Sequence, residues 1–168
     1  MCYKLNNMKQ PEMYEITSAD DTRMSIVIRL FSQYLSELGE ELGFQQVDAE
    51  LENPMKKYGP PAGALLLAYI DGQPAGCVAL QPLPEKDTCE MKRLYVLPEF
   101  RGYKLGRVLA EAIVQKATDM GYHTMMLDTL DRLQSAIALY QRMGFTGTAP
   151  YYNNPLEGVV YMQKPLSR

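Results

Sequence analysis

A turn that combines two glycines with three cations is the part of this chain whose residue types are best suited to chemistry. It reads Arg101-Gly102-Tyr103-Lys104-Leu105-Gly106-Arg107, and it lies between an apolar run typical of a strand (residues 94–96) and a segment with helical periodicity. The first turn of a helix presents unpaired N–H groups and partial positive charge, so it can hold an anion without a dedicated side chain. The turn therefore predicts a site for a phosphorylated cofactor.

Residues 89–102, which run into this turn, resemble the acetyl-CoA-binding core of the GNAT superfamily of N-acetyltransferases. In that family the turn usually reads Arg or Gln, two variable residues, Gly, a variable residue, and then Gly or Ala. Arg101 and Gly106 match this pattern, whereas Lys104 stands where the middle glycine is common. A lysine is strained at positive φ, and so we expect a negative φ at Lys104.

A second segment, residues 136–145, resembles the other signature of this superfamily, a helix closed by a glycine and an aromatic residue. The two signatures occur in the expected order, and the resemblance extends over residues 64–165. It implies a fold of the α/β (α+β) class, with a mixed, mostly antiparallel sheet of about six to seven strands and about four flanking helices. It also implies an enzyme that moves an acetyl group from acetyl-CoA to a primary amine, by direct attack within a ternary complex.

The resemblance carries the cofactor contacts over to two places in this sequence. The pantetheine arm of acetyl-CoA would run beside the strand and bind the backbones of Leu94, Tyr95 and Val96. The pyrophosphate would bind the turn residues Arg101, Gly102, Tyr103, Lys104, Leu105, Gly106 and Arg107. Leu133 departs from the family, because many members have an asparagine there that contacts the arm. The alternative interpretation of the turn is an ordinary helix start with solvated cations.

Three residues take catalytic roles by the same resemblance. Glu90 stands where several members keep a general base, which the acceptor needs because only about one primary ammonium in a thousand is deprotonated at neutral pH. The N–H of Leu94 would stabilise the oxyanion if the strand is bulged there. Tyr140 corresponds to the usual general acid, which protonates the departing thiolate. The alternatives are a strand glutamate paired with Lys92 and a tyrosine that only fills the core.

The acceptor is a small-molecule or peptide amine, and the resemblance places its pocket in residues 39–61 and 150–158. Four aromatic residues in these segments are candidate pocket walls: Phe44, Tyr58, Tyr151 and Tyr152. Residues 37–53 carry six acidic side chains and no lysine or arginine, so they could steer a cationic amine toward the site. The alternatives are aromatic plugs of the core and a solvated helix face.

Composition and charge exclude several other classes of function. A chain of 168 residues fits one domain. Its net charge of −3 and pI near 5.2 argue against a nucleic-acid partner, which would require a basic excess. Cys2, Cys77 and Cys89 form no CxxC pair and His123 is the single histidine, so no metal site is expected. No apolar run has signal-peptide or membrane-spanning character, and we therefore expect a cytoplasmic protein without a membrane partner.

The elements that must position these residues follow from periodicity and turn signals. Residues 1–13 form a loose leader, and residues 14–168 form the single acetyltransferase domain. Asp71 and Gly72 join two β-rich runs as a hairpin. A helical crossover makes the strand at residues 124–127 parallel to the strand at residues 88–96. We expect strands at residues 14–16, 64–70, 75–81, 88–96, 124–127, 145–148 and 159–163, and helices at residues 24–38, 47–52, 105–120 and around Tyr140.

Three alternatives to this interpretation remain open. A glycine turn followed by Asp128 at the end of the next strand is also a pattern of dinucleotide-binding enzymes, although the glycines do not make G-x-G-x-x-G. The chain could also be an acyl-CoA-binding module without turnover. Cys77 or Cys89 could carry the acyl group covalently, although no histidine lies nearby in sequence. Pairing of edge strands makes a homodimer possible in each case.

Overall fold

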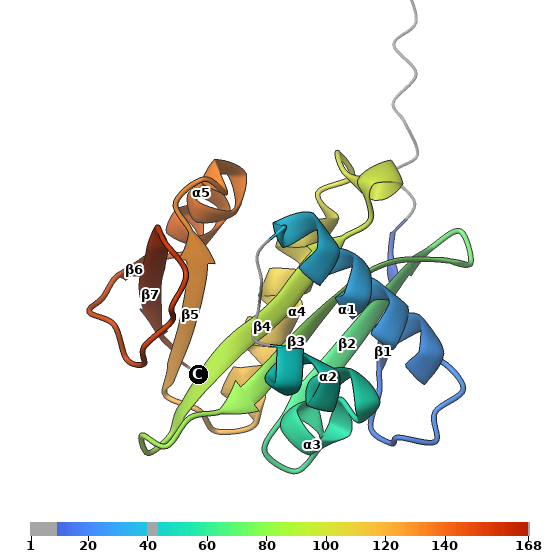
Figure 1. Cartoon of the computed structure of the whole chain (residues 1–168), viewed down its shortest axis with the longest axis horizontal. Helices are drawn as coiled ribbons and strands as arrows, with labels where there is room; N and C mark the ends of the chain where they lie inside the picture. The colour runs from blue at the N-terminus through green and yellow to red at the C-terminus, as the bar shows by residue number, and fades with distance from the viewer. Residues whose placement is uncertain (1–9, 40–43, 168) are drawn as a thin grey trace, which may run out of the picture.

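The computed structural model describes residues 10–39 and 44–167, with residues 44–46 described by their backbone alone. Within this part, seven strands form one sheet in the order β1-β2-β3-β4-β5-β7-β6, and only β4 and β5 run parallel (Figure 1). The strands are β1 (Glu12–Glu15), β2 (Ala64–Ile70), β3 (Gln73–Pro82), β4 (Thr88–Val96), β5 (Thr124–Leu130), β6 (Thr146–Gly147) and β7 (Val159–Pro165). The helices are α1 (Met24–Leu38), α2 (Phe44–Glu52), α3 (Met55–Tyr58), α4 (Leu105–Asp119) and α5 (Gln134–Arg142).

The mixed, mostly antiparallel sheet confirms the predicted fold class. It excludes the dinucleotide-binding alternative, because that fold needs a mostly parallel sheet. The described residues form one α-helix more than expected, the single turn α3. No helix among them is long and apolar enough to cross a membrane.

The predicted leader of residues 1–13 is wrong at its C-terminal end. Glu12 and Met13 belong to β1, which pairs antiparallel with β2. The β2–β3 hairpin presents an edge of backbone hydrogen-bonding groups, and the chain extends along that edge as a further strand. The folded domain therefore starts no later than Glu12, while residues 1–9 lie outside the described part of the chain.

Helices cover both faces of the sheet. In Figure 1, α1, α2 and α3 lie in front of it and α4 lies behind it. Leu65 and Leu67 pack with α1 in one core, while Leu66 and Ala68 pack with α4 in the other. Successive side chains of a strand point to opposite faces, which explains why residues 64–70 are apolar at almost every position.

The β2–β3 hairpin and the turn before α4 both contain residues with left-handed backbone. Asp71 and Gly72 have φ values of 53° and 72°, and they close the predicted hairpin between β2 and β3. The φ of Lys104 is 58°, so the expected negative φ is wrong. The chain reverses there between the 3₁₀ turn at Pro98–Phe100 and the first residue of α4. Lys104 adopts a left-handed conformation that glycine would adopt freely, at a cost of about 1–2 kcal/mol.

The parallel strands β4 and β5 stay paired over a short distance only. Their register runs from Thr88 with Thr124 to Glu90 with Met126 and ends there. Farther along β4, Arg93 and Leu94 together oppose one residue of β3, and the φ of Arg93 is 56°. Such a bulge bends a strand and increases its twist. β4 and β5 therefore diverge beyond Glu90.

Candidate functional site

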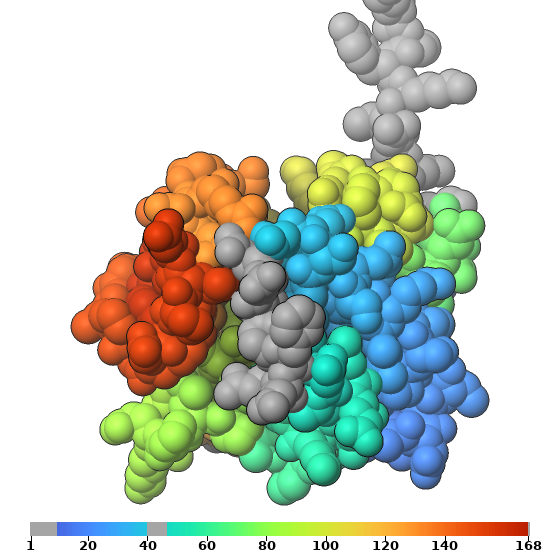
Figure 2. Space-filling model, in the orientation of Figure 1, coloured from blue at the N-terminus to red at the C-terminus, as the bar shows by residue number. Residues whose placement is uncertain are grey.

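A cavity of about 1710 Å³ opens where β4 and β5 diverge. Side chains of α1, α2 and α3 line one side of it, and α5 and the loop before β7 line the other. Figure 2 shows the C-terminal segment (red) on the left of the molecule and the N-terminal helices (blue to teal) on the right. The lining combines acidic, basic and aromatic residues, which suits a polar ligand of defined orientation.

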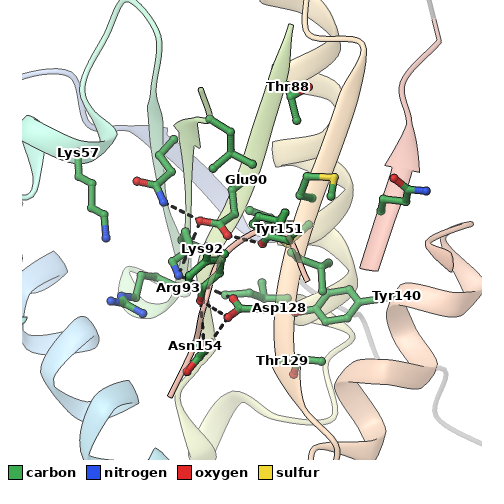
Figure 3. Close-up of a pocket in the computed structure, with 18 of the residues that line it drawn as sticks. Lys57, Thr88, Glu90, Lys92, Arg93, Asp128, Thr129, Tyr140, Tyr151 and Asn154 are labelled. Atoms are coloured by element: carbon green, nitrogen blue, oxygen red, sulfur yellow. Dashed lines mark hydrogen bonds and ion pairs between the residues drawn. The ribbon is translucent and has the colours of Figure 1, made fainter. Parts of the chain in front are cut away.

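Glu90 lies on β4 at the wall of this cavity and is 2% exposed. Gln81 Nε2 donates to its Oε1 at 2.6 Å, and the hydroxyl of Tyr151 donates to its Oε2 (Figure 3). Lys92 Nζ lies 3.8 Å from Oε1, which is an ion pair without a direct hydrogen bond. Burial, followed by the charge of Glu90, raises the pKa of Tyr151 well above its ordinary value, so this hydroxyl keeps its proton. Two donors thus hold the Glu90 side chain in place.

A second carboxylate, Asp128 on β5, lies beside this one. Tyr152 donates its hydroxyl to Asp128 Oδ2, Asn154 Nδ2 donates to the same oxygen at 2.9 Å, and Lys92 Nζ lies 3.8 Å from Oδ1. Lys92 therefore stands between Glu90 and Asp128 (Figure 3). Sequence reasoning used Asp128 only for the dinucleotide alternative and missed its place here. The predicted parallel pairing of the Asp128 strand with the Glu90 strand could have indicated that the two carboxylates lie close together.

Tyr140 and Leu94 both line the cavity. Tyr140 projects from α5, is 8% exposed, and packs its ring 5.8 Å from the ring of Phe145. Burial raises the pKa of Tyr140 above its ordinary value, so the phenol is protonated at neutral pH. Leu94 lies in the bulge, which meets the structural condition that its predicted backbone role requires.

The glycine turn follows the 3₁₀ turn at Pro98–Phe100 and leads into α4. Arg101 Nε donates to the carbonyl oxygen of Val96 at 3.1 Å, and its Nη2 donates to Glu37 Oε2 at 2.7 Å. Tyr95 turns its side chain to the face covered by α1, where its hydroxyl donates to Glu37 Oε1 at 2.6 Å. All the predicted cofactor-binding residues are described. Leu94 lines the cavity, whereas the others do not line it and follow in β4 and in the turn.

The four aromatic residues predicted to wall the acceptor pocket have different positions. Tyr151 and Tyr152 line the cavity as expected. Tyr58 does not, and its prediction is wrong, because α3 turns the ring into the core against Phe31, where it is 0% exposed. The side chain of Phe44 lies outside the described part of the chain.

Tyr58 instead supports a buried carboxylate that sequence reasoning missed. Its hydroxyl donates to Glu50 Oε1 at 2.5 Å, Arg93 Nε donates to Glu50 Oε2 at 2.7 Å, and Lys57 Nζ lies 3.2 Å from Oε1. Burial alone would raise the pKa of Glu50, but the charge of Arg93 and the donated hydrogen bonds hold it below its ordinary value. In the sequence, Glu50 was one member of an acidic run expected to steer a cation. Both Glu50 and Glu37 are instead occupied by cations of this chain.

Cys77 and Cys89 are both buried in the sheet. Burial raises the pKa of each thiol to about 12, so neither is a thiolate at neutral pH. A protonated, buried thiol is a poor nucleophile, and neither residue lines the cavity. These positions do not support a covalent acyl carrier.

Comparison with known proteins gives one consistent result. Residues 25–145 match the family described as the acetyltransferase (GNAT) family. An uncharacterized N-acetyltransferase of Schizosaccharomyces pombe is 50% identical over 150 residues, which cover 89% of each chain. A solved structure from Klebsiella pneumoniae, described as an acyl-CoA N-acyltransferase, is 30% identical with a TM-score of 0.71, covering 94% of this chain and 99% of that one. The structure of YncA from Salmonella typhimurium with its cofactor acetyl-CoA is 18% identical with a TM-score of 0.68, covering 94% and 95%.

Proposed function

Since the chain belongs to the GNAT acetyltransferase family and is an N-acetyltransferase, we propose that it moves an acetyl group from acetyl-CoA to a primary amine by direct attack within a ternary complex. One observation carries the proposal: the β4 bulge, Glu90 and Tyr140 all line one cavity. Its volume of about 1710 Å³ leaves room for a thioester and an acceptor together, because a pocket for one drug-sized ligand is about 300–1,000 Å³.

The free thiols of Cys77 and Cys89 support a reducing, cytoplasmic location.

Acetyl-CoA binds along the second half of β4 in this proposal. β5 pairs with β4 no farther than Glu90, so among the described residues the strand has no partner on this side at Leu94, Tyr95 and Val96. The amides of the pantetheine arm can bind such an edge as an added strand would. The pyrophosphate binds the turn from Arg101 to Arg107 at the start of α4. The acetyl-CoA in the Salmonella structure of the same fold supports this choice of cofactor.

Glu90 is the proposed general base. Gln81 and Tyr151 hold its carboxylate at the cavity wall, where it takes a proton from the acceptor ammonium directly or through a bridging water. The amine nitrogen then forms a bond to the thioester carbon, and the carbonyl oxygen becomes an oxyanion. The N–H of Leu94 at the bulge is the proposed donor to that oxyanion.

Tyr140 is the proposed general acid for the leaving group. The C–S bond breaks when the tetrahedral intermediate collapses, and the sulfur leaves as a thiolate. Since burial raises the pKa of Tyr140, the phenol holds its proton at neutral pH until the thiolate develops beside it. The thiolate takes the proton of Tyr140 and leaves as the thiol of CoA. The acceptor nitrogen loses two protons in all, one to Glu90 before attack and a second from the tetrahedral intermediate to solvent. One of these protons returns to Tyr140 through solvent, and the other is released to bulk water.

Calorimetric titration with acetyl-CoA, CoA and NAD in parallel tests the cofactor. We expect binding of both CoA species and none of NAD, and binding of NAD alone would contradict the proposal. Initial rates at varied acetyl-CoA and amine then test the mechanism, since a ternary complex gives intersecting reciprocal plots and a covalent carrier gives parallel ones. The Cys77→Ala/Cys89→Ala double variant should stay active. Acetyl-CoA binding without turnover of any amine would instead identify a binding module.

A further inference from the structure

Two clusters of opposite net charge lie on opposite sides of the cavity between β4 and β5. The cationic cluster contains Lys57 and Arg93 with one carboxylate, Glu50. The acidic cluster contains Glu90 and Asp128 with one ammonium, Lys92. Counted over the described residues, each cluster therefore keeps one formal charge uncompensated, positive in the first and negative in the second. Figure 3 shows Lys57 and Arg93 on one side, Glu90 and Asp128 on the other, and Lys92 between them.

Arg93 and Lys57 of the cationic cluster have N–H donors that Glu50 does not use. Glu50 is 5% exposed and already accepts from Tyr58, Arg93 and Lys57 through its two oxygens. Among the described residues, Arg93 gives Glu50 its Nε–H and Lys57 gives it one of three ammonium protons. The side chain of Lys57 is 41% exposed, and both cations line the cavity. Guanidinium and ammonium groups of this kind bind a carboxylate strongly where water is partly excluded.

The acidic cluster is suited to an ammonium group. Tyr151 holds Glu90, while Tyr152 and Asn154 hold Asp128, so both carboxylates are oriented by neutral donors. Lys92 is 3.8 Å from each carboxylate, too far for a direct hydrogen bond to either. A second cation can approach the same oxygens and complete the charge balance of the cluster.

We propose that the acceptor is a free amino acid, a molecule that carries a carboxylate as well as the amine to be acetylated. Its amine lies at Glu90 and Asp128, and its carboxylate binds Lys57 and Arg93. This inference rests on the proposed function, because it assigns the acceptor of the same reaction. A simple amine or a polyamine would leave the excess positive charge of Lys57 and Arg93 without a partner. A peptide N-terminus has an amide in place of that carboxylate.

Matched acceptors test the charge requirement directly. A panel of L-amino acids is compared with the corresponding C-terminal amides and decarboxylated amines, for example phenylalanine, phenylalaninamide and phenethylamine. We expect kcat/KM to be at least about tenfold higher for the preferred acid than for its amide or amine. Equal values, or higher values for the neutral or cationic partners, would overturn the inference and leave the proposed function intact. If acetyl-CoA binds but no member of the panel is acetylated, the inference is overturned, and the proposed function fails as well only if no other amine is acetylated.

Two neighbouring lysines of α3 provide matched variants. Lys57→Met should lower the ratio of kcat/KM for the acid over that for its decarboxylated amine by at least about tenfold, and Lys57→Arg should restore it. Lys56, which is exposed and does not line the cavity, gives the control Lys56→Met, whose ratio should match the wild type. Melting temperatures of all variants show whether they fold. A ratio unchanged in a folded Lys57→Met variant would remove Lys57 from the acceptor site.

Discussion

Replacing Lys104 with glycine should stabilise the fold, although it removes a charged side chain from the start of α4. Lys104 has φ 58° and ψ 21°, and its side chain makes no capping hydrogen bond. The left-handed conformation costs a residue with a Cβ about 1–2 kcal/mol, which glycine avoids. Glycine also makes the unfolded chain more flexible, which costs about 0.4–1 kcal/mol. The difference is a net stabilisation of about 1 kcal/mol, or a rise in Tm of about 2–4 °C for a chain of this size.

The control for this variant is Lys104→Ala. Alanine removes the same charge and the same flexible side chain, but it keeps the Cβ that makes the left-handed conformation unfavourable. Thermal unfolding followed by circular dichroism should therefore give a higher Tm for the glycine variant than for the alanine variant. Both variants remove one cation from the proposed pyrophosphate site, so calorimetry should show the same loss of acetyl-CoA affinity in each.

Equal melting temperatures for the two variants would refute the reasoning, because they would mean that the backbone of residue 104 is not strained in solution. A glycine variant less stable than the wild type would refute it as well, since the Lys104 side chain would then contribute more than the strain costs. A difference in acetyl-CoA affinity between the variants would show that the conformation of the turn had changed, since both variants remove the same charge.

Three further predictions concern the site. Tyr140→Phe should lower kcat by about a hundredfold with little change in acetyl-CoA affinity, because it removes only the proposed acid, as steady-state rates and calorimetry would show. Glu37→Gln should tighten acetyl-CoA binding about two- to fivefold in calorimetry, because it frees Arg101 from an exposed ion pair; weaker binding would contradict this. Glu50→Gln should destabilise the fold by about 3 kcal/mol at pH 7. Burial raises the pKa of Glu50, but Arg93 lowers it by more, so the net pKa is below its ordinary value of 4.5. The stabilisation by the Glu50 carboxylate is therefore complete above pH 4.5 and is lost as the pH falls below that value. Urea unfolding should show the difference in stability between wild type and variant becoming smaller as the pH is lowered.

Local patterns were sufficient to predict most of the elements. The hairpin at Asp71 and Gly72 and the helix that follows the glycine turn depend on residues close together in the chain, and both occur as expected. The expected leader failed at Glu12 and Met13 because their strand is induced by the distant edge of β2. The expected φ of Lys104 failed because the path of the chain into α4, and not the preference of the residue, decides its backbone.

Some residues of the candidate site could be predicted from local motifs, and others could not. Glu90, Leu94 and Tyr140 could be proposed from their places in recurring motifs, and all three line the cavity. Tyr58 could not be told from a pocket residue, since an aromatic residue after a short turn fits either place. Its burial depends on packing against Phe31 of α1, far away in the chain.

The sequence by itself determined the order of strands and helices, the glycine turn at the start of α4 and the motifs of the GNAT family, because these depend on periodicity and on residues adjacent in the chain. The tertiary structure alone decided how the charges pair. Glu50 and Arg93 are 43 residues apart, and Glu90 and Tyr151 are 61 apart. Electrostatic energies depend on distance and burial in space, and so the two clusters of opposite charge exist only after β4 and β5 have diverged between the helices and the C-terminal loop.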